Sequence, residues 1–221
     1  MKWLPVVLFF VTNIYANNLK VTILYESLCP DSVNFLKNQF YPTYNILKEK
    51  LDVELVPFGK ANATKINNTW YFHCQHKEAE CYGNKVQSCA IDLTPKNVSV
   101  EFVMCAMKSG DASDDTILKQ CAGDSNVTWS DIENCLNSGK GDALLAKNGE
   151  KTNELRPNIP MVPTIILNGV YSEAVQNLAL KNFQDLAALI LEEQKSGGDS
   201  SIDFSKKIVF FAMGLYILLV V

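Results

Sequence analysis

The 221-residue chain contains seven cysteines, and their spacing restricts both the folds and the chemistry open to it. Six of them fall within about 60 residues: Cys74, Cys81, Cys89, Cys105, Cys121 and Cys135. In a protein of the secretory pathway such a cluster predicts three disulfides, with fifteen connectivities that sequence does not distinguish. Cys29 lies 45 residues before the cluster and is left over. It is reactive, bonded to another chain, or simply buried, and the spacing leaves these three alternatives open.

The N-terminus carries the pattern of a secretory signal. An apolar stretch, Leu4 to Val11, follows a single lysine and leads to the small residue Ala16, which predicts a signal peptide over residues 1–16. A buried first strand or helix is the alternative. The mature domain then covers residues 17–195, which is long enough for one domain with a sizeable core.

The C-terminal segment, residues 196–221, combines small residues, a polar spacer and an apolar tail. The tail, Ile208 to Val221, is shorter than the roughly 20 residues of a membrane-spanning helix. The whole pattern is typical of a glycosylphosphatidylinositol (GPI) anchor signal. A tail anchor beginning at Phe204 and an uncleaved hydrophobic tail remain open. Any membrane attachment is therefore expected through this segment.

Four glycosylation sequons support a place in the secretory pathway, with acceptors Asn62, Asn67, Asn97 and Asn126. Their clustering predicts that this part of the chain is exposed. The sequence leaves open whether the protein is secreted, lysosomal or at the cell surface. The net charge is −4 and Arg156 is the only arginine, which argues against a nucleic-acid partner.

The first elements predicted along the chain are strand, helix and strand. Alternating apolar residues predict strands from Leu19 to Glu26 and from Leu51 to Phe58. Apolar residues at helical spacing predict a helix between these two strands. Pro42 should kink or break this helix. Two parallel strands joined by a helix form a right-handed crossover unit. Residues from about 60 to 158 then read as an insertion of short helices joined by the disulfides.

The last part of the chain completes an α/β, thioredoxin-like order of elements with a disulfide-stapled helical insertion. Val162 to Leu167 is an apolar run, Asn168-Gly169 fits a tight hairpin turn into a return strand, and a final helix has an apolar face from Phe183 to Leu191. Thioredoxin-like folds place a cis proline before the third strand, close to the reactive cysteine. We therefore predict that Pro163 follows a cis peptide bond and lies in the catalytic region.

Cys29 stands at the predicted junction of the first strand and the first helix, in Cys29-Pro30-Asp31-Ser32. Unpaired backbone N–H groups at a helix N-terminus stabilise a thiolate, the form that attacks a disulfide. Asp31 opposes this effect because it places a like charge nearby. Thiol oxidoreductases with this geometry carry a second cysteine where this chain has Ser32. Cys29 is therefore predicted to act as a single nucleophile.

A zinc site is an alternative for part of the cysteine cluster, because Cys74, His76, Cys81 and Cys89 fall close together in sequence. These residues lack the close ligand pairs of most zinc sites, and an oxidising compartment favours disulfides. We expect no bound metal, and surface or structural roles for His73 and His76.

The segment from Cys74 to Cys89 reads Cys-Gln-His-Lys-Glu-Ala-Glu-Cys-Tyr-Gly-Asn-Lys-Val-Gln-Ser-Cys. It resembles the signature of the gamma-interferon-inducible lysosomal thiol reductase (GILT) family, Cys-Gln-His-Gly-x2-Glu-Cys-x2-Asn-x4-Cys, and departs from it at Lys77. The resemblance extends over most of the mature chain. It implies a thioredoxin-like reductase that acts on protein disulfides at acidic pH through a Cys-x-x-Cys pair. Cys29 corresponds to the attacking cysteine of that pair and Ser32 to the resolving one.

Two functions follow from a lone Cys29. In the first, the protein is a monothiol oxidoreductase for disulfide-containing protein substrates, without a bound cofactor. An external thiol such as glutathione or cysteine then releases the mixed disulfide. In the second, the protein is a catalytically impaired family member that binds a protein or cell-surface partner. Ser32, Asp31 and the predicted anchor segment favour the second, whereas Cys29, its helix start and the Pro163 loop favour the first.

Overall fold

The computed structural model describes residues 18–154 and 161–195. The predicted signal peptide and the predicted anchor segment lie outside these residues. The elements in chain order are β1 (Leu19–Tyr25), α1 (Pro30–Phe35), the π-helical turn η1 (Leu36–Phe40), α2 (Tyr41–Leu47), the 3₁₀ turn η2 (Lys48–Lys50), β2 (Leu51–Pro57), β3 (Asn62–Ile66), β4 (Thr69–His73), α3 (Lys77–Leu93), α4 (Lys96–Lys108), α5 (Asp115–Asp124), α6 (Trp129–Asn137), α7 (Lys140–Asn153), β5 (Thr164–Leu167) and α8 (Glu173–Lys195).

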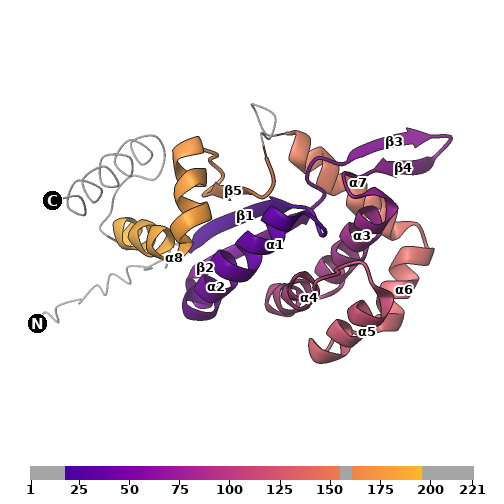
Figure 1. The fold of residues 1–221 in the computed structure, drawn as a ribbon, viewed down its shortest axis with the longest axis horizontal. Helices are drawn as coiled ribbons and strands as arrows, with labels where there is room; N and C mark the ends of the chain where they lie inside the picture. Colours follow the sequence, from indigo (N-terminus) through magenta and orange to yellow (C-terminus); the bar gives the residue numbers. More distant parts are fainter. Residues whose placement is uncertain (1–17, 155–160, 196–221) are drawn as a thin grey trace, which may run out of the picture.

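The central sheet has three strands in the order β2-β1-β5 (Figure 1). β1 and β2 are parallel, in a register that pairs Leu19 with Leu51. β5 runs antiparallel to β1 and pairs Ile165 with Ile23. The predicted strand–helix–parallel strand unit is therefore present, and it places the carboxyl end of β1 at the start of α1.

The helix between these strands continues past Pro42. The chain stays helical through α1, η1 and α2, and Pro42 lies near the start of α2, directly after the π-helical turn. A π turn shifts the hydrogen-bond partners by one residue, so the helix continues past a residue that has no N–H to donate. Of the two expected effects, a kink or a break, the break is wrong because one widened turn absorbs the proline.

The main core lies between one face of the sheet and the helices. Alternate residues of β1, including Val21, Ile23 and Tyr25, are fully buried on this face. Phe35 packs edge-to-face against Phe183 of α8, with ring centroids 5.7 Å apart. Apolar burial of this kind supplies most of the favourable free energy of folding. It fixes the position of α1, and therefore of the residues at its N-terminus.

The insertion occupies one side of the sheet and consists of the β3–β4 hairpin and helices α3 to α7 (Figure 1). The hairpin was not expected from the sequence; Asn67 and Asn68 form its turn with φ of 48° and 66°. The three predicted disulfides are present as Cys74–Cys81, Cys89–Cys135 and Cys105–Cys121. Each joins elements of the insertion, which confirms that disulfides staple it.

The expected hairpin after β5 is only partly formed. Asn168 and Gly169 have φ of 50° and 78°, as a tight turn requires, but the returning chain makes a single bridge from Val170 to Leu167. The predicted return strand is wrong because α8 begins at Glu173, so too few residues remain to extend the ladder.

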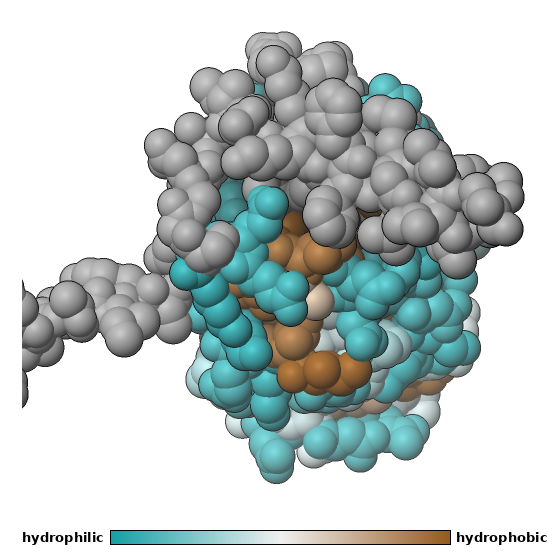
Figure 2. Space-filling view, turned by 90° about the vertical axis from the view of Figure 1, so that its left-hand side faces the viewer, coloured by the Kyte–Doolittle hydropathy of each residue, from teal (hydrophilic) through white to brown (hydrophobic). Residues whose placement is uncertain are grey.

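The exposure of the glycosylation acceptors agrees with the expectation from the sequence. All four acceptor asparagines, Asn62, Asn67, Asn97 and Asn126, are exposed. Apolar residues gather in a band on the side of the molecule shown in Figure 2, with hydrophilic residues on both sides of the band. Within residues 18–154 and 161–195, no helix has the length and apolar character needed to cross a membrane.

Candidate functional site

Cys29 lies where β1 ends and α1 begins. It is the N-cap residue of α1, and its backbone oxygen accepts a hydrogen bond from Val33 N at 3.0 Å. Among the described residues Cys29 is the one free cysteine, and 8% of its surface is exposed. Its neighbours Pro30 and Asp31 are exposed. The thiol therefore lies at the surface margin of the core, at the N-terminus of α1.

The loop before β5 approaches Cys29 from a distant part of the sequence. The Cys29 Sγ lies 3.9 Å from the backbone oxygen of Val162, and the Val162–Pro163 peptide bond is cis. Gln176 of α8 holds this loop. Its buried side-chain amide donates to Pro163 O and accepts from Ile165 N, both at 2.8 Å. The fold thus brings Cys29 and Pro163 together. Gln176 holds the Pro163 loop through its two hydrogen bonds, a role that the sequence did not predict.

Ser32 lies in the first turn of α1 and is fully buried. Its Oγ accepts a hydrogen bond from Glu26 N at 3.3 Å. The hydroxyl therefore ties the helix back to the end of β1. A hydroxyl does not take part in disulfide exchange, so Ser32 has a structural contact here but no means of resolving a mixed disulfide.

Residues of the signature segment hold the turn that leads into Cys29. Ser27 N donates to Asn84 Oδ1 at 2.8 Å, and Ser27 Oγ donates to Glu80 O at 3.2 Å. A side chain at Gly83 would place its Cβ 2.7 Å from Ser27 Oγ, so α3 approaches the turn at a glycine. The signature therefore supports the position of Cys29 without supplying the nucleophile.

The departure from the signature at Lys77 has a backbone explanation. Lys77 has φ of 66°, in the left-handed region, at the first position of α3. Glycine adopts this conformation without steric cost, whereas other residues lose about 1 kcal/mol or more. A glycine would adopt this φ without strain, and Lys77 adopts it at an energetic cost.

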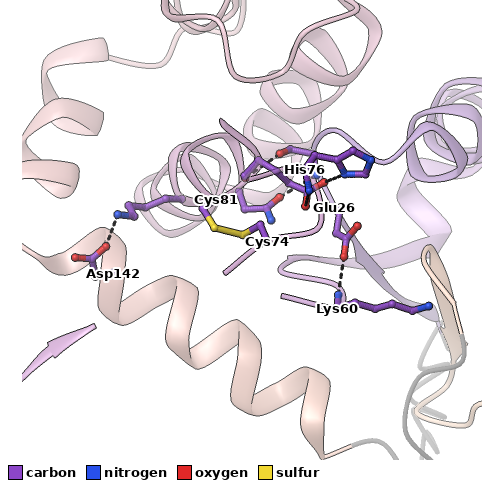
Figure 3. The surroundings of a disulfide bond; sticks show 10 residues. Glu26, Lys60, Cys74, His76, Cys81 and Asp142 are labelled. Carbon is purple, nitrogen blue, oxygen red and sulfur yellow. Dashed lines mark hydrogen bonds and ion pairs between the residues drawn. A yellow bond between two sulfur atoms is a disulfide. The ribbon is translucent and has the colours of Figure 1, made fainter. Parts of the chain in front are cut away.

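Beside the Cys74–Cys81 disulfide, two buried carboxylates and an imidazole lie close together (Figure 3). Glu26 and Glu80 are fully buried, and His76 Nδ1 lies 2.6 Å from Glu80 Oε2. Burial raises the pKa of Glu26 from 4.5 to about 7. The Lys60 backbone N–H lowers that pKa, the Glu80 carboxylate raises it, and His76 and the Lys60 ammonium lower it. The carboxyl of Glu26 therefore titrates near neutral pH.

We expect this raised pKa to make the protein less stable as the pH rises from about 4.5 to 7 in buffer free of divalent cations. Over that range the unfolded chain releases the Glu26 proton while the folded protein keeps it, so ionisation favours unfolding by about 1 to 3 kcal/mol. Below that range both states are protonated, and above it both are ionised. Urea unfolding of wild type and Glu26→Gln at several pH values measures the difference. Parallel pH profiles for the two proteins would contradict the assignment.

Comparison with known proteins shows which family has a sequence similar to that of this chain. Residues 20–125 match the family model for gamma interferon inducible lysosomal thiol reductase (GILT). A gamma-interferon-inducible lysosomal thiol reductase-like protein of Anopheles gambiae is 35% identical over 186 residues, which cover 79% of this chain and 77% of that protein. The chain belongs to the GILT family. A gamma-interferon-inducible lysosomal thiol reductase of Carassius auratus is 33% identical over 81% of this chain and 71% of that protein.

Solved structures confirm the thioredoxin-like fold of this GILT-family chain. The DsbA of Chlamydia trachomatis aligns with a TM-score of 0.57 at 13% identity, over 91% of this chain and 99% of that one. The DsbA of Pseudomonas aeruginosa aligns with a TM-score of 0.51, also at 13% identity, over 82% and 86%. At such low identity the likeness concerns the fold alone.

The predicted site residues therefore separate into two groups. Cys29, Ser32 and Pro163 converge at the end of β1, whereas the other six cysteines form the staples of the insertion. Sequence reasoning missed Glu26 and Gln176, which lie beside this site. A signal for Glu26 was available, since a charged residue directly follows a strand buried along most of its length.

Proposed function

We propose that this GILT-family protein exchanges thiols with disulfide-containing protein substrates through Cys29 as a single nucleophile. The observation that carries the proposal is the free thiol of Cys29 at the N-cap of α1, beside the cis Val162–Pro163 bond, with Ser32 at the resolving position. A place in the secretory pathway, including the lysosome, is supported by the four exposed glycosylation acceptors and by the lysosomal names of the relatives.

The exchange balances in three steps. The Cys29 thiolate attacks one sulfur of a substrate disulfide, which forms a mixed disulfide and releases the other substrate sulfur as a thiolate. An external thiolate, such as that of glutathione or cysteine, then attacks the Cys29 sulfur of the mixed disulfide and releases the reduced substrate. A second external thiol frees Cys29 and leaves the external thiol as its disulfide. Two external thiols are oxidised for each substrate disulfide reduced.

The test is disulfide reduction by the mature protein with glutathione as the thiol source, at pH 5 and pH 7. We expect Cys29→Ser to reduce the rate to that of glutathione alone, because Cys29 is the only unpaired thiol of the described residues. Near-UV circular dichroism establishes that the variant is folded. Equal rates for wild type and Cys29→Ser at both pH values would reject thiol exchange.

A second candidate function is substrate binding without turnover. It is favoured by Ser32, whose buried hydroxyl is already engaged by Glu26 N and offers no route for release. Mixed disulfides would then persist after denaturing electrophoresis without reducing agent and would be absent from Cys29→Ser. Partners that are retained equally by wild type and Cys29→Ser would instead indicate a non-covalent binding protein.

A further inference from the structure

Glu26, from the end of β1, and His76 and Glu80, from the start of α3, converge at one point (Figure 3). Glu26 follows β1, His76 precedes α3, and Glu80 lies in the first turn of α3. One ligand atom from each residue lies within 4.8 Å of the other two. Both glutamate side chains are fully buried, while 42% of the His76 side chain is exposed. The cluster is thus enclosed on the protein side and accessible through the imidazole.

The Glu26 carboxylate is only half satisfied by the described residues. Its Oε1 accepts a hydrogen bond from Lys60 N at 2.7 Å, but its buried Oε2 has no hydrogen-bond partner among them. Within residues 18–154 and 161–195, the Glu80 carboxylate has hydrogen bonds with His76 only, through the imidazole at 2.6 Å and the backbone N–H at 3.1 Å. A buried carboxylate oxygen without a partner is costly, and a second carboxylate beside it adds repulsion. A cation between them would remove both costs.

The surrounding fold leaves room for these side chains and fixes their positions. A Cβ at Gly59 would overlap the Glu26 side chain, so the glycine provides the space that Glu26 occupies. The Cys74–Cys81 disulfide closes the loop that contains His76 and sets its two ends 5.6 Å apart. Ligands held before binding lose little conformational freedom when an ion arrives.

We propose that Glu26, His76 and Glu80 form a binding site for a divalent transition-metal ion, with Zn²⁺ as the fitting ion. One imidazole nitrogen and two carboxylate oxygens make a donor set that zinc accepts, with a fourth position open to water. Calcium and magnesium fit less well because they prefer oxygen ligands throughout, whereas one of these three donors is an imidazole nitrogen. Tetrahedral zinc places its ligand atoms about 3.3 Å apart, so small side-chain shifts close the site. The site uses none of the cysteines and does not depend on thiol exchange at Cys29.

The proposal is tested with Cys29→Ser protein, in which no free thiol of the described residues can bind zinc. We expect calorimetric titration with Zn²⁺ at pH 7.4 to show one ion per chain. Adding Glu26→Gln or His76→Gln should weaken binding at least about tenfold, because each removes a ligand. His73→Gln is the matched control. His73 is exposed at the end of β4, is the only other histidine of the chain, and its loss should leave binding unchanged.

Three outcomes would overturn the proposal: no binding at pH 7.4, binding that survives both ligand substitutions, or binding that His73→Gln weakens as much as His76→Gln. If the ligand variants fail to fold, the absorption spectrum of Co²⁺ bound to the Cys29→Ser protein still tests which atoms bind the metal. Nitrogen and oxygen ligands in a four-coordinate site give visible bands without a thiolate charge-transfer band. A thiolate band, or a spectrum that matches octahedral aqueous Co²⁺, would contradict the assigned ligands.

Discussion

We expect Ser32→Cys to reduce protein disulfides at least about tenfold faster than wild type, because a tethered thiol acts at an effective concentration far above that of external glutathione. Ser32 lies in the same helical turn as the N-cap Cys29. The new thiol would attack the Cys29 sulfur of the mixed disulfide, release the reduced substrate, and leave a disulfide between Cys29 and the introduced cysteine. An external thiol would then reduce that disulfide after the substrate has been released.

Two controls isolate the role of the added thiol. Ser32→Ala removes the contact with Glu26 N but adds no thiol, so it separates the loss of that hydrogen bond from the gain of a resolving group. Ser32→Cys combined with Cys29→Ser keeps the new thiol but removes the attacking one, and it should be inactive. The rate of reduction and the amount of trapped mixed disulfide are both measured. Equal rates for Ser32→Cys and Ser32→Ala would show that release of the substrate does not limit turnover.

The sequence predicts the elements around Cys29 well because their signals are local. The alternation of β1, the parallel partner β2 and the final amphipathic helix α8 are each visible as a periodicity within one segment. The sequence did not predict the β3–β4 hairpin because this local signal is weak there. Its strands are mostly exposed, so burial imposes little hydrophobic alternation on them beyond Trp70 and Phe72.

The pairing of the cysteines and the Glu26 cluster could not be predicted, because both depend on how distant segments pack. Cys89 on α3 and Cys135 on α6 are 46 residues apart in sequence and are brought together by the packing of the helices of the insertion. Glu26 meets His76 and Glu80 across about 50 residues of sequence in the same way. Local spacing carries information about which cysteines are clustered, but the partner of each is decided by the tertiary fold.

Removing the Cys89–Cys135 disulfide should cost more stability than removing either of the other two. The chain-entropy model relates the cost to the length of the closed loop, because a cross-link restricts the unfolded chain. For the sequence separations of 46, 16 and 7 residues, the model gives about 4, 3 and 2.5 kcal/mol for Cys89–Cys135, Cys105–Cys121 and Cys74–Cys81. Paired substitutions to alanine, unfolded in urea without reducing agent, measure each cost.

The three alanine pairs serve as controls for one another, because each removes two sulfurs and one cross-link. An equal loss from all three would indicate that packing of the sulfurs, and not restriction of the unfolded chain, dominates. Removing the Cys74–Cys81 disulfide distinguishes an effect on stability from an effect on zinc binding. It should cost the least free energy of unfolding, yet it closes the loop that carries His76 beside the turn leading to Cys29. If its removal disturbs zinc binding more than removal of Cys89–Cys135 does, the short disulfide serves chiefly to position His76, and the long one to hold the insertion together.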